Sequence, residues 1–273
     1  MPKIPIDGDF QLFYYDDDFT DPWKESHVVL LQHGFSRNGR FWYSWVPLLA
    51  REYRVLRPDM RGLGFSSMSE DRYEPSLDTF AEDLLKLLDD LGIQKVIFVG
   101  ESFGGIIGLK FAHAYPERTR ALVLCNTPCR LPGRELRQRF SAGGDWEATM
   151  NRGVGAWSRG TINMRLDTRL APEGLKEWYI AEMDKTPPKI GWKLQSYVDT
   201  LDFREQLKEI TVPTLLLVGE LTPTSPLPQQ QFMHEQIPNS RLVAFPGAGH
   251  GINAIYPERC VEELRRFVGL LPD

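Results

Sequence analysis

One serine lies where it could act as a nucleophile. Ser102 is the centre of Gly100-x-Ser102-x-Gly104, which follows an apolar run at 96–99 and precedes a helical pattern at 106–112. A tight turn from strand to helix forces its central residue into an unfavourable backbone conformation, and small neighbours are needed to fit it. The helix N-terminus favours negative charge that develops on a substrate oxygen. The pattern predicts a nucleophilic Ser102, with a glycine-rich turn that carries no chemistry as the alternative.

His250 is the candidate base. It lies between two glycines in a loop after the apolar run at 241–245. Loops beyond the carboxyl ends of parallel strands are where such sheets place their sites. A neutral imidazole there could take the proton of Ser102 and return it to a leaving group. A histidine in an ordinary surface loop is the alternative.

Two other polar residues fit structural roles better than catalytic ones. His33 directly follows an apolar run and precedes Gly34, so we expect it to hold its loop while the N–H of Phe35 faces the site. Asp59 follows the next apolar run, and we expect it to pair with Arg61 and with backbone amides. A catalytic His33 and a general base at Asp59 are the alternatives.

Apolar runs and helical periodicity alternate along the chain on both sides of the serine. Runs typical of strands lie at 10–15, 28–31, 53–58, 96–99, 120–125, 212–218 and 241–245. Helical patterns lie at 42–50, 77–91, 106–112, 227–236 and 257–268. This alternation predicts an α/β fold with a mostly parallel sheet covered by helices on both faces.

The alternation stops between 128 and 203. That stretch lacks a convincing strand and is rich in tryptophan and arginine, namely Trp146, Trp157, Trp178, Trp192, Arg130, Arg134, Arg137, Arg139, Arg152, Arg159, Arg165 and Arg169. We interpret 128–203 as an inserted helical cap on a core formed by 1–127 and 204–273. Most of these arginines are expected to be solvated or paired, and Arg130 and Trp157, with Gly34, are the predicted substrate contacts.

Composition restricts the partners. The chain has 273 residues, is 42% hydrophobic and carries a net charge of -5, which argues against a nucleic-acid or anionic-membrane partner. A small anionic substrate remains compatible with a locally basic pocket. The three cysteines, Cys125, Cys129 and Cys260, show no metal spacing and indicate reduced thiols in a cytoplasmic protein. We expect neither an export signal nor a membrane span, and a homodimer is left open.

Four motifs in order carry a resemblance to a known family. They are His33-Gly34-Phe35, Asp59-x-Arg61-Gly62-x-Gly64-x-Ser66, Gly100-x-Ser102-x-Gly104-Gly105 and Gly249-His250. Together they resemble the α/β-hydrolase fold, in the branch of 3-oxoadipate enol-lactonases, ring-cleavage-product hydrolases and small esterases or amidases. The resemblance implies an eight-stranded, mostly parallel sheet with an all-helical cap, an oxyanion hole from the N–H groups of Phe35 and Phe103, and neither cofactor nor metal.

One position departs from the family pattern. Members usually carry an Asp two residues beyond the Glu of a Gly-Glu-x-Asp turn, and Thr222 stands there. Loss of that carboxylate typically costs about 10⁴ in turnover. Glu220 on the same turn is the favoured substitute partner of His250. Asn126, which ends another strand, could only orient the ring, and a Ser-His dyad is the remaining alternative.

The leading hypothesis is hydrolysis of a small ester, lactone or amide through an acyl-enzyme on Ser102. The arginine-rich cap suggests a substrate that bears a carboxylate. Carbon–carbon bond hydrolysis of a ring-cleavage product is the alternative, although Glu101 and the absent Asp make it less attractive. A serine at the elbow disfavours dehalogenase chemistry. Thr222 favours a third hypothesis, a binding protein that kept the pocket and lost turnover.

Overall fold

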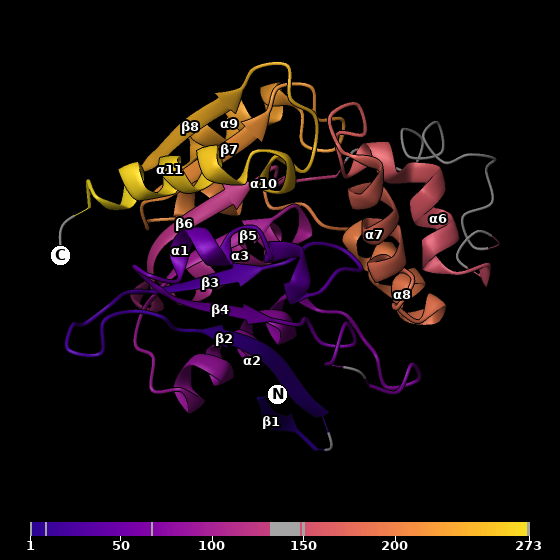
Figure 1. Cartoon of the computed structure of the whole chain (residues 1–273), viewed down its shortest axis with the longest axis horizontal. Coiled ribbons are helices and arrows are strands. Elements are labelled where there is room, and N and C mark those ends of the chain that lie inside the picture. Colours follow the sequence, from indigo (N-terminus) through magenta and orange to yellow (C-terminus); the bar gives the residue numbers. More distant parts are fainter. Residues whose placement is uncertain (1, 9, 67, 132–147, 149–150, 272–273) are drawn as a thin grey trace.

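A single sheet forms the centre of the chain. The computed structural model describes residues 2–8, 10–66, 68–131, 148 and 151–271 (Figure 1). Eight strands lie in the order β1-β2-β4-β3-β5-β6-β7-β8. They are β1 (Lys3–Asp7), β2 (Phe10–Asp17), β3 (Val28–Gln32), β4 (Arg54–Pro58), β5 (Val96–Glu101), β6 (Thr119–Cys125), β7 (Thr214–Gly219) and β8 (Ser240–Phe245). Strand β2 pairs antiparallel with β1 and β4, and every later pairing is parallel, which confirms the predicted sheet.

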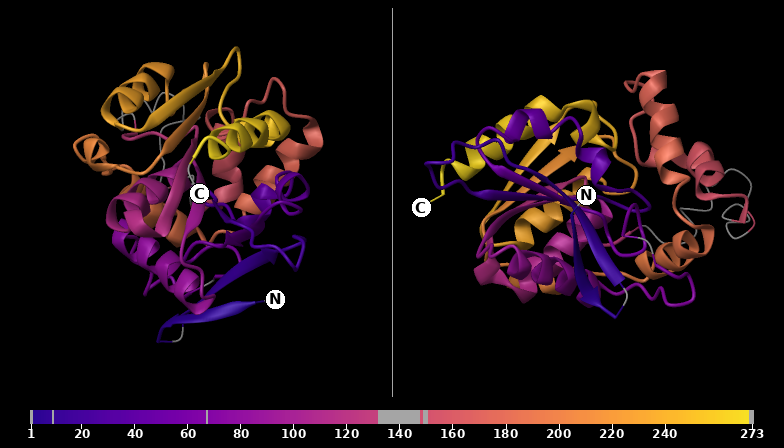
Figure 2. Two further views of the ribbon diagram at one scale, coloured as in Figure 1. Left: turned by 90° about the vertical axis from the view of Figure 1, so that its left-hand side faces the viewer. Right: turned by 60° about the horizontal axis from the view of Figure 1, so that its bottom comes forward.

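Helices cover both faces of this sheet (Figures 1 and 2). One face carries α2 (Leu77–Asp90), α3 (Phe103–Ala114) and α9 (Leu227–Gln236), and the other carries α1 (Val46–Leu49), α10 (Ile252–Ile255) and α11 (Pro257–Val268). Side chains of a strand alternate between faces, so Phe98 of β5 joins the first apolar cluster while Ile97 and Val99 join the second. Burial on both faces explains why β5 reads as a continuous apolar run.

Two elements differ from the sequence-based prediction. Strand β1 was not expected, because Pro5 interrupts its pattern; it lies at the sheet edge, where a missing N–H is tolerated. The predicted helix at 42–50 is divided into a 3₁₀ turn, η1 (Gly39–Trp42), and α1. Pro47 is the reason: it cannot donate within a continuing helix but fits the first turn of a new one.

Three helices lie beside the carboxyl ends of the parallel strands (Figure 1). They are α6 (Val154–Thr161), α7 (Glu173–Met183) and α8 (Pro188–Val198), all between β6 and β7. We keep the name cap for 128–203, as proposed from the sequence. Trp146, Arg134, Arg137 and Arg139 lie outside the described residues. Among the described helices, none is both long and apolar enough to cross a bilayer.

Candidate active site

Ser102 occupies a strained turn at the end of β5. Its φ of 53° and ψ of -119° lie outside the regions that L-residues prefer, as expected for the junction between β5 and α3. A Cβ added to Gly100 would lie 2.5 Å from the carbonyl oxygen of Gly104, and one added to Gly104 would lie 2.4 Å from that of His33. Only glycine therefore fits on either side of the serine.

The loop after β3 closes against this turn. A Cβ on Gly34 would lie 3.4 Å from the Cβ of Ser102, so this backbone passes directly beside the serine. The N–H groups of Phe35 and Phe103 donate to no other described residue. Two backbone donors next to a serine are what an oxyanion hole requires.

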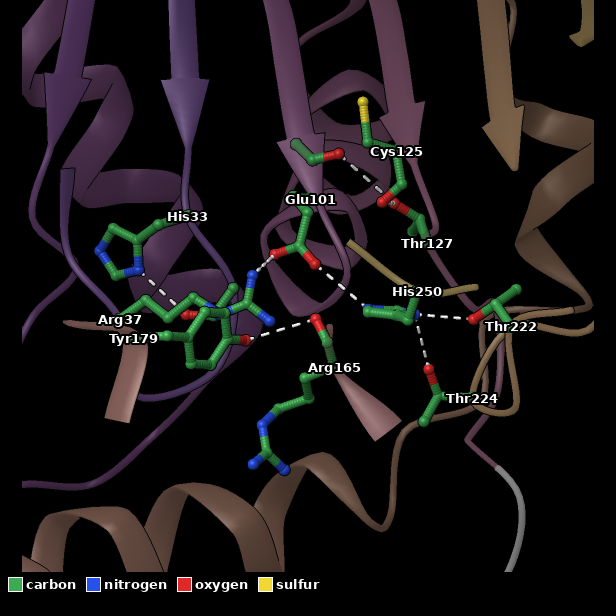
Figure 3. Close-up of polar contacts among 12 residues, drawn as sticks. His33, Arg37, Glu101, Cys125, Thr127, Arg165, Tyr179, Thr222, Thr224 and His250 are labelled. Atoms are coloured by element: carbon green, nitrogen blue, oxygen red, sulfur yellow. Dashed lines mark hydrogen bonds and ion pairs between the residues drawn. The ribbon is translucent and has the colours of Figure 1, made fainter. Parts of the chain in front are cut away.

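The loop after β8 brings His250 into contact with Glu101, the residue directly before the serine (Figure 3). Its ring is fully buried, and Nδ1 lies 2.7 Å from Thr222 Oγ1 and 3.0 Å from Thr224 Oγ1. Its Nε2 lies 3.2 Å from Glu101 Oε1. Burial lowers the pKa of His250, and Glu101 opposes that shift only in part. The ring is therefore neutral at neutral pH, the state that a general base requires.

The prediction that Glu220 is the acid partner of His250 is not met. Glu220 is exposed, and its carboxylate accepts from the N–H of Gly247 at 2.9 Å. It caps the turn after β8 on the outside of the molecule, while the hydroxyl of Thr222 occupies the position next to Nδ1. Asn126 does not orient the ring either, because its amide atoms form no hydrogen bond with any described residue.

Glu101 is the carboxylate that contacts His250, and sequence analysis missed this role. Its other oxygen forms an ion pair with Arg37, whose guanidinium lies over the rings of Phe41 and Tyr179 at 5.6 and 5.1 Å. Burial would raise the pKa of Glu101, but Arg37 and then His250 outweigh burial and lower it. The carboxylate is therefore ionised. Its place directly before the serine, at the end of an apolar strand, was the available signal.

His33 has the structural role that was predicted. Its Nε2 accepts from the N–H of Met60 at 2.9 Å, and its Nδ1 then donates to the carbonyl of Gly34 at 3.0 Å. Burial lowers its pKa to about 4. Both nitrogens are engaged with the backbone, so the ring fixes the loop that carries Gly34 and Phe35.

The prediction for Asp59 is half right. Its two oxygens accept from the N–H groups of Gly39 and Phe65, each at 2.7 Å. Its predicted partner Arg61 instead pairs with Asp83 at 2.6 Å. A buried carboxylate on α2 gives the arginine a bidentate contact, and no hydrogen bond between Arg61 and Asp59 is seen among the described residues.

A mainly apolar cavity lies between Ser102 and the cap. Its lining comprises Phe35, Ser102, Phe103, Ile106, Pro128, Leu131, Trp157, Thr161, Met164, Arg165, Gln195, Val198 and Thr224. The lining therefore combines the serine and both proposed oxyanion residues with one charged side chain, Arg165. Trp157, one of the predicted substrate contacts, also lies in this lining.

The arginine that lines this cavity is Arg165 and not the predicted Arg130. Arg130 is half exposed, lies 3.8 Å from Asp202 and does not line the cavity. Arg165 is buried, its Nη1 donates to Thr161 Oγ1 at 3.0 Å, and its guanidinium stacks over Trp157 at 4.0 Å. Burial lowers its pKa to about 10, so it stays cationic at neutral pH. No described carboxylate forms an ion pair with it.

Comparison with known proteins identifies the family. The profile of the alpha/beta hydrolase fold matches residues 27–254, and the chain belongs to this family. A pimeloyl-[acyl-carrier protein] methyl ester esterase from Aeromonas hydrophila is 27% identical, over 88% of this chain and 95% of its own.

Solved structures show the same fold. The enol-lactonase from Burkholderia xenovorans LB400 superposes with a TM-score of 0.86 at 22% identity, covering 98% of this chain and 100% of its own. A thermophilic esterase from Thermogutta terrifontis, with malate bound, has a TM-score of 0.80 at 27% identity and covers 98% and 97%.

Proposed function

We propose that the chain is a serine hydrolase of small carboxylic esters, lactones or amides. The observation that carries the proposal is the juxtaposition at the end of β5: Ser102, strained and lining the cavity, directly follows the residue whose carboxylate lies 3.2 Å from Nε2 of His250. The esterase and lactonase relatives support this class of reaction.

The reaction follows from the groups present. The Oγ of Ser102 attacks the substrate carbonyl as its proton passes to Nε2 of His250, in the tautomer that carries the ring proton on Nδ1, and the carbonyl electron pair moves onto oxygen. The N–H groups of Phe35 and Phe103 stabilise that oxyanion. Its collapse expels the alkoxide or amine, which takes the proton from Nε2. A water activated by the same nitrogen then releases the acid and restores the serine.

Arg165 supports a substrate that carries a carboxylate. It is cationic, buried in the cavity that holds Ser102 and without an acidic partner among the described residues. A buried cation without a counterion is costly, and an anionic ligand would offset that cost. The malate held by the T. terrifontis esterase is an anion of this type.

A fluorophosphonate probe tests the nucleophile. We expect wild-type protein to be labelled and to hydrolyse p-nitrophenyl esters, and Ser102→Ala to do neither. A folded wild-type protein that resists labelling would contradict the proposal.

A pair of esters tests the anion site. We expect mono-p-nitrophenyl succinate to be cleaved more efficiently than p-nitrophenyl butyrate, and Arg165→Met to remove this preference through KM. Arg159→Met is the control, because Arg159 is an exposed arginine of the same cap and is paired with Glu177. Equal rates on both esters in the wild type would remove the support for a carboxylate.

A binding protein without turnover is the second candidate. The observation that favours it is the hydroxyl of Thr222 at 2.7 Å from Nδ1, where the family pattern has a carboxylate. Tight binding of succinate esters without product, in a protein that fluorophosphonate does not label, would establish it. Carbon–carbon bond hydrolysis stays an alternative within enzymes, and location in the cytoplasm stays a prediction.

A further inference from the structure

We propose that Glu101 is the charge partner of His250 in this protein, acting on Nε2 in place of the acid that usually contacts Nδ1. The inference rests on the proposed function and assigns a further residue to it. Two observations carry it: Glu101 Oε1 lies 3.2 Å from Nε2, and the two partners of Nδ1 are the neutral hydroxyls of Thr222 and Thr224 (Figure 3).

The charges around the ring explain why a carboxylate is needed. His250 is fully buried, and the charged groups that face it are Glu101, Arg37 and Arg165. Both arginines disfavour a positive imidazolium, and Glu101 favours it. Without Glu101, the proton from Ser102 would create a third buried cation beside two others. The carboxylate therefore lowers the free energy of protonating His250 at this buried position.

The hydroxyls at Nδ1 complement the carboxylate. An ionised carboxylate only accepts hydrogen bonds, so the contact with Glu101 places the resting proton on Nε2. A hydroxyl can donate or accept, so Thr222 satisfies Nδ1 in either tautomer. When the proton moves to Nδ1, the Nε2 lone pair faces Glu101 and becomes more basic. Uptake of the Ser102 proton by Nε2 removes the repulsion between this lone pair and the carboxylate of Glu101.

Removal of the charge tests the proposal directly. Glu101→Gln keeps the side-chain shape, and we expect the pKa of His250 to fall by about one unit or more, as expected for loss of an adjacent opposite charge. The ring is followed by NMR with labelled histidine, assigned with His250→Ala. The acid limb of the kcat/KM profile should move to lower pH, and kcat should fall about 100-fold. An unchanged His250 pKa would overturn the proposal.

A matched control separates charge from packing. Glu182 is also a buried carboxylate paired with an arginine, Arg40, but it belongs to α7 and has no contact with His250. Glu182→Gln should leave the His250 pKa unchanged. If Glu101→Gln does not fold, Glu101→Gln with Arg37→Met replaces it and removes both members of the buried ion pair: the His250 pKa should still fall, because Glu101 acts on the ring more strongly than Arg37, and an unchanged pKa would overturn the proposal.

Restoring the usual acid gives a second test. Thr222→Asp places a carboxylate at Nδ1, so it should restore most of the activity that Glu101→Gln loses yet raise wild-type activity less than tenfold. Equal gains in both backgrounds would mean that Glu101 supplies no charge. Fluorophosphonate labelling of the wild type is read beside these variants, because unlabelled protein refutes the hydrolase while the NMR pKa still decides the role of Glu101.

Discussion

Two buried histidines, one after β3 and one after β8, differ in the groups that contact their ring nitrogens, and those groups determine whether the ring can change its protonation state. Both His33 and His250 are about 1% exposed, and burial lowers both pKa values. His33 is held by backbone groups at both nitrogens. His250 instead has hydroxyls at one nitrogen and a carboxylate at the other. The first arrangement fixes a neutral ring, and the second allows the ring to gain and lose a proton.

The largest expected effect separates the two rings by function. His250→Ala should lower kcat/KM about 10³-fold or more, because the base is lost. His33→Gln should keep most activity, because its amide oxygen can still accept from Met60, and should show its effect in urea unfolding. Ester turnover and unfolding of both variants check this. Equal loss of activity in folded His33→Gln would mean that the two rings do not differ in the way proposed.

The pH dependence of stability sharpens the same contrast. Folded His33 stays neutral down to about pH 4, whereas the unfolded ring binds a proton near pH 6.5. Protonation between these values favours the unfolded state, so this contribution is complete above pH 6.5 and lost as the pH falls to 4. The pKa difference corresponds to about 3 kcal/mol. Wild type should therefore lose stability relative to His33→Gln across this range.

Urea titrations of both proteins at several pH values measure this difference. Asp59, whose pKa burial raises to about 6, gives the opposite slope, because its folded form binds the extra proton. Asp59 is present in both proteins, so its contribution cancels in the difference between their free energies of unfolding. A gap that does not change between pH 4 and 6.5 would show that His33 is not held neutral.

The hydroxyls at Nδ1 define the next effect. Thr222→Val should lower kcat about tenfold, which corresponds to the free energy of one hydrogen bond that orients the ring. The loss should not be larger, because Thr224 Oγ1 remains 3.0 Å from Nδ1. Thr222→Val with Thr224→Val should cost more than either change alone, because Nδ1 is then unpaired. Single-turnover kinetics measure both. Full activity in the double variant would show that ring orientation depends on Glu101 alone.

The sequence predicted what local patterns determine. Ser102 and its turn follow from neighbouring glycines, and the sheet follows from apolar runs that both clusters bury. The position of Glu101 directly before the serine made it a candidate, but its contact with His250 joins residues 149 positions apart, and no local pattern identifies that partner. Glu220 was favoured because it lies near Thr222 in the sequence, but its carboxylate accepts a hydrogen bond from the N–H of Gly247 and not from His250. Arg165 could not be distinguished from the other cap arginines before its burial was known.

The smallest expected effect concerns what holds the loop of His250. Asp167, a cap residue, accepts from the N–H of Gly249 at 2.7 Å and donates its own N–H to the carbonyl of His250 at 2.8 Å. The loop of His33 is held by Met60 of the core. The cap therefore takes part in positioning the base.

Asp167→Ala removes the acceptor but keeps the backbone contact, so we expect kcat to fall about threefold, at the low end for one hydrogen bond. Asp167→Asn retains an oxygen for Gly249 and serves as the control; it loses the ion pair with exposed Arg169, which contributes little. Steady-state kinetics should show the loss in kcat rather than in KM. A change in KM alone would mean that this part of the cap only encloses the substrate, because a displaced base slows the chemical step without weakening binding.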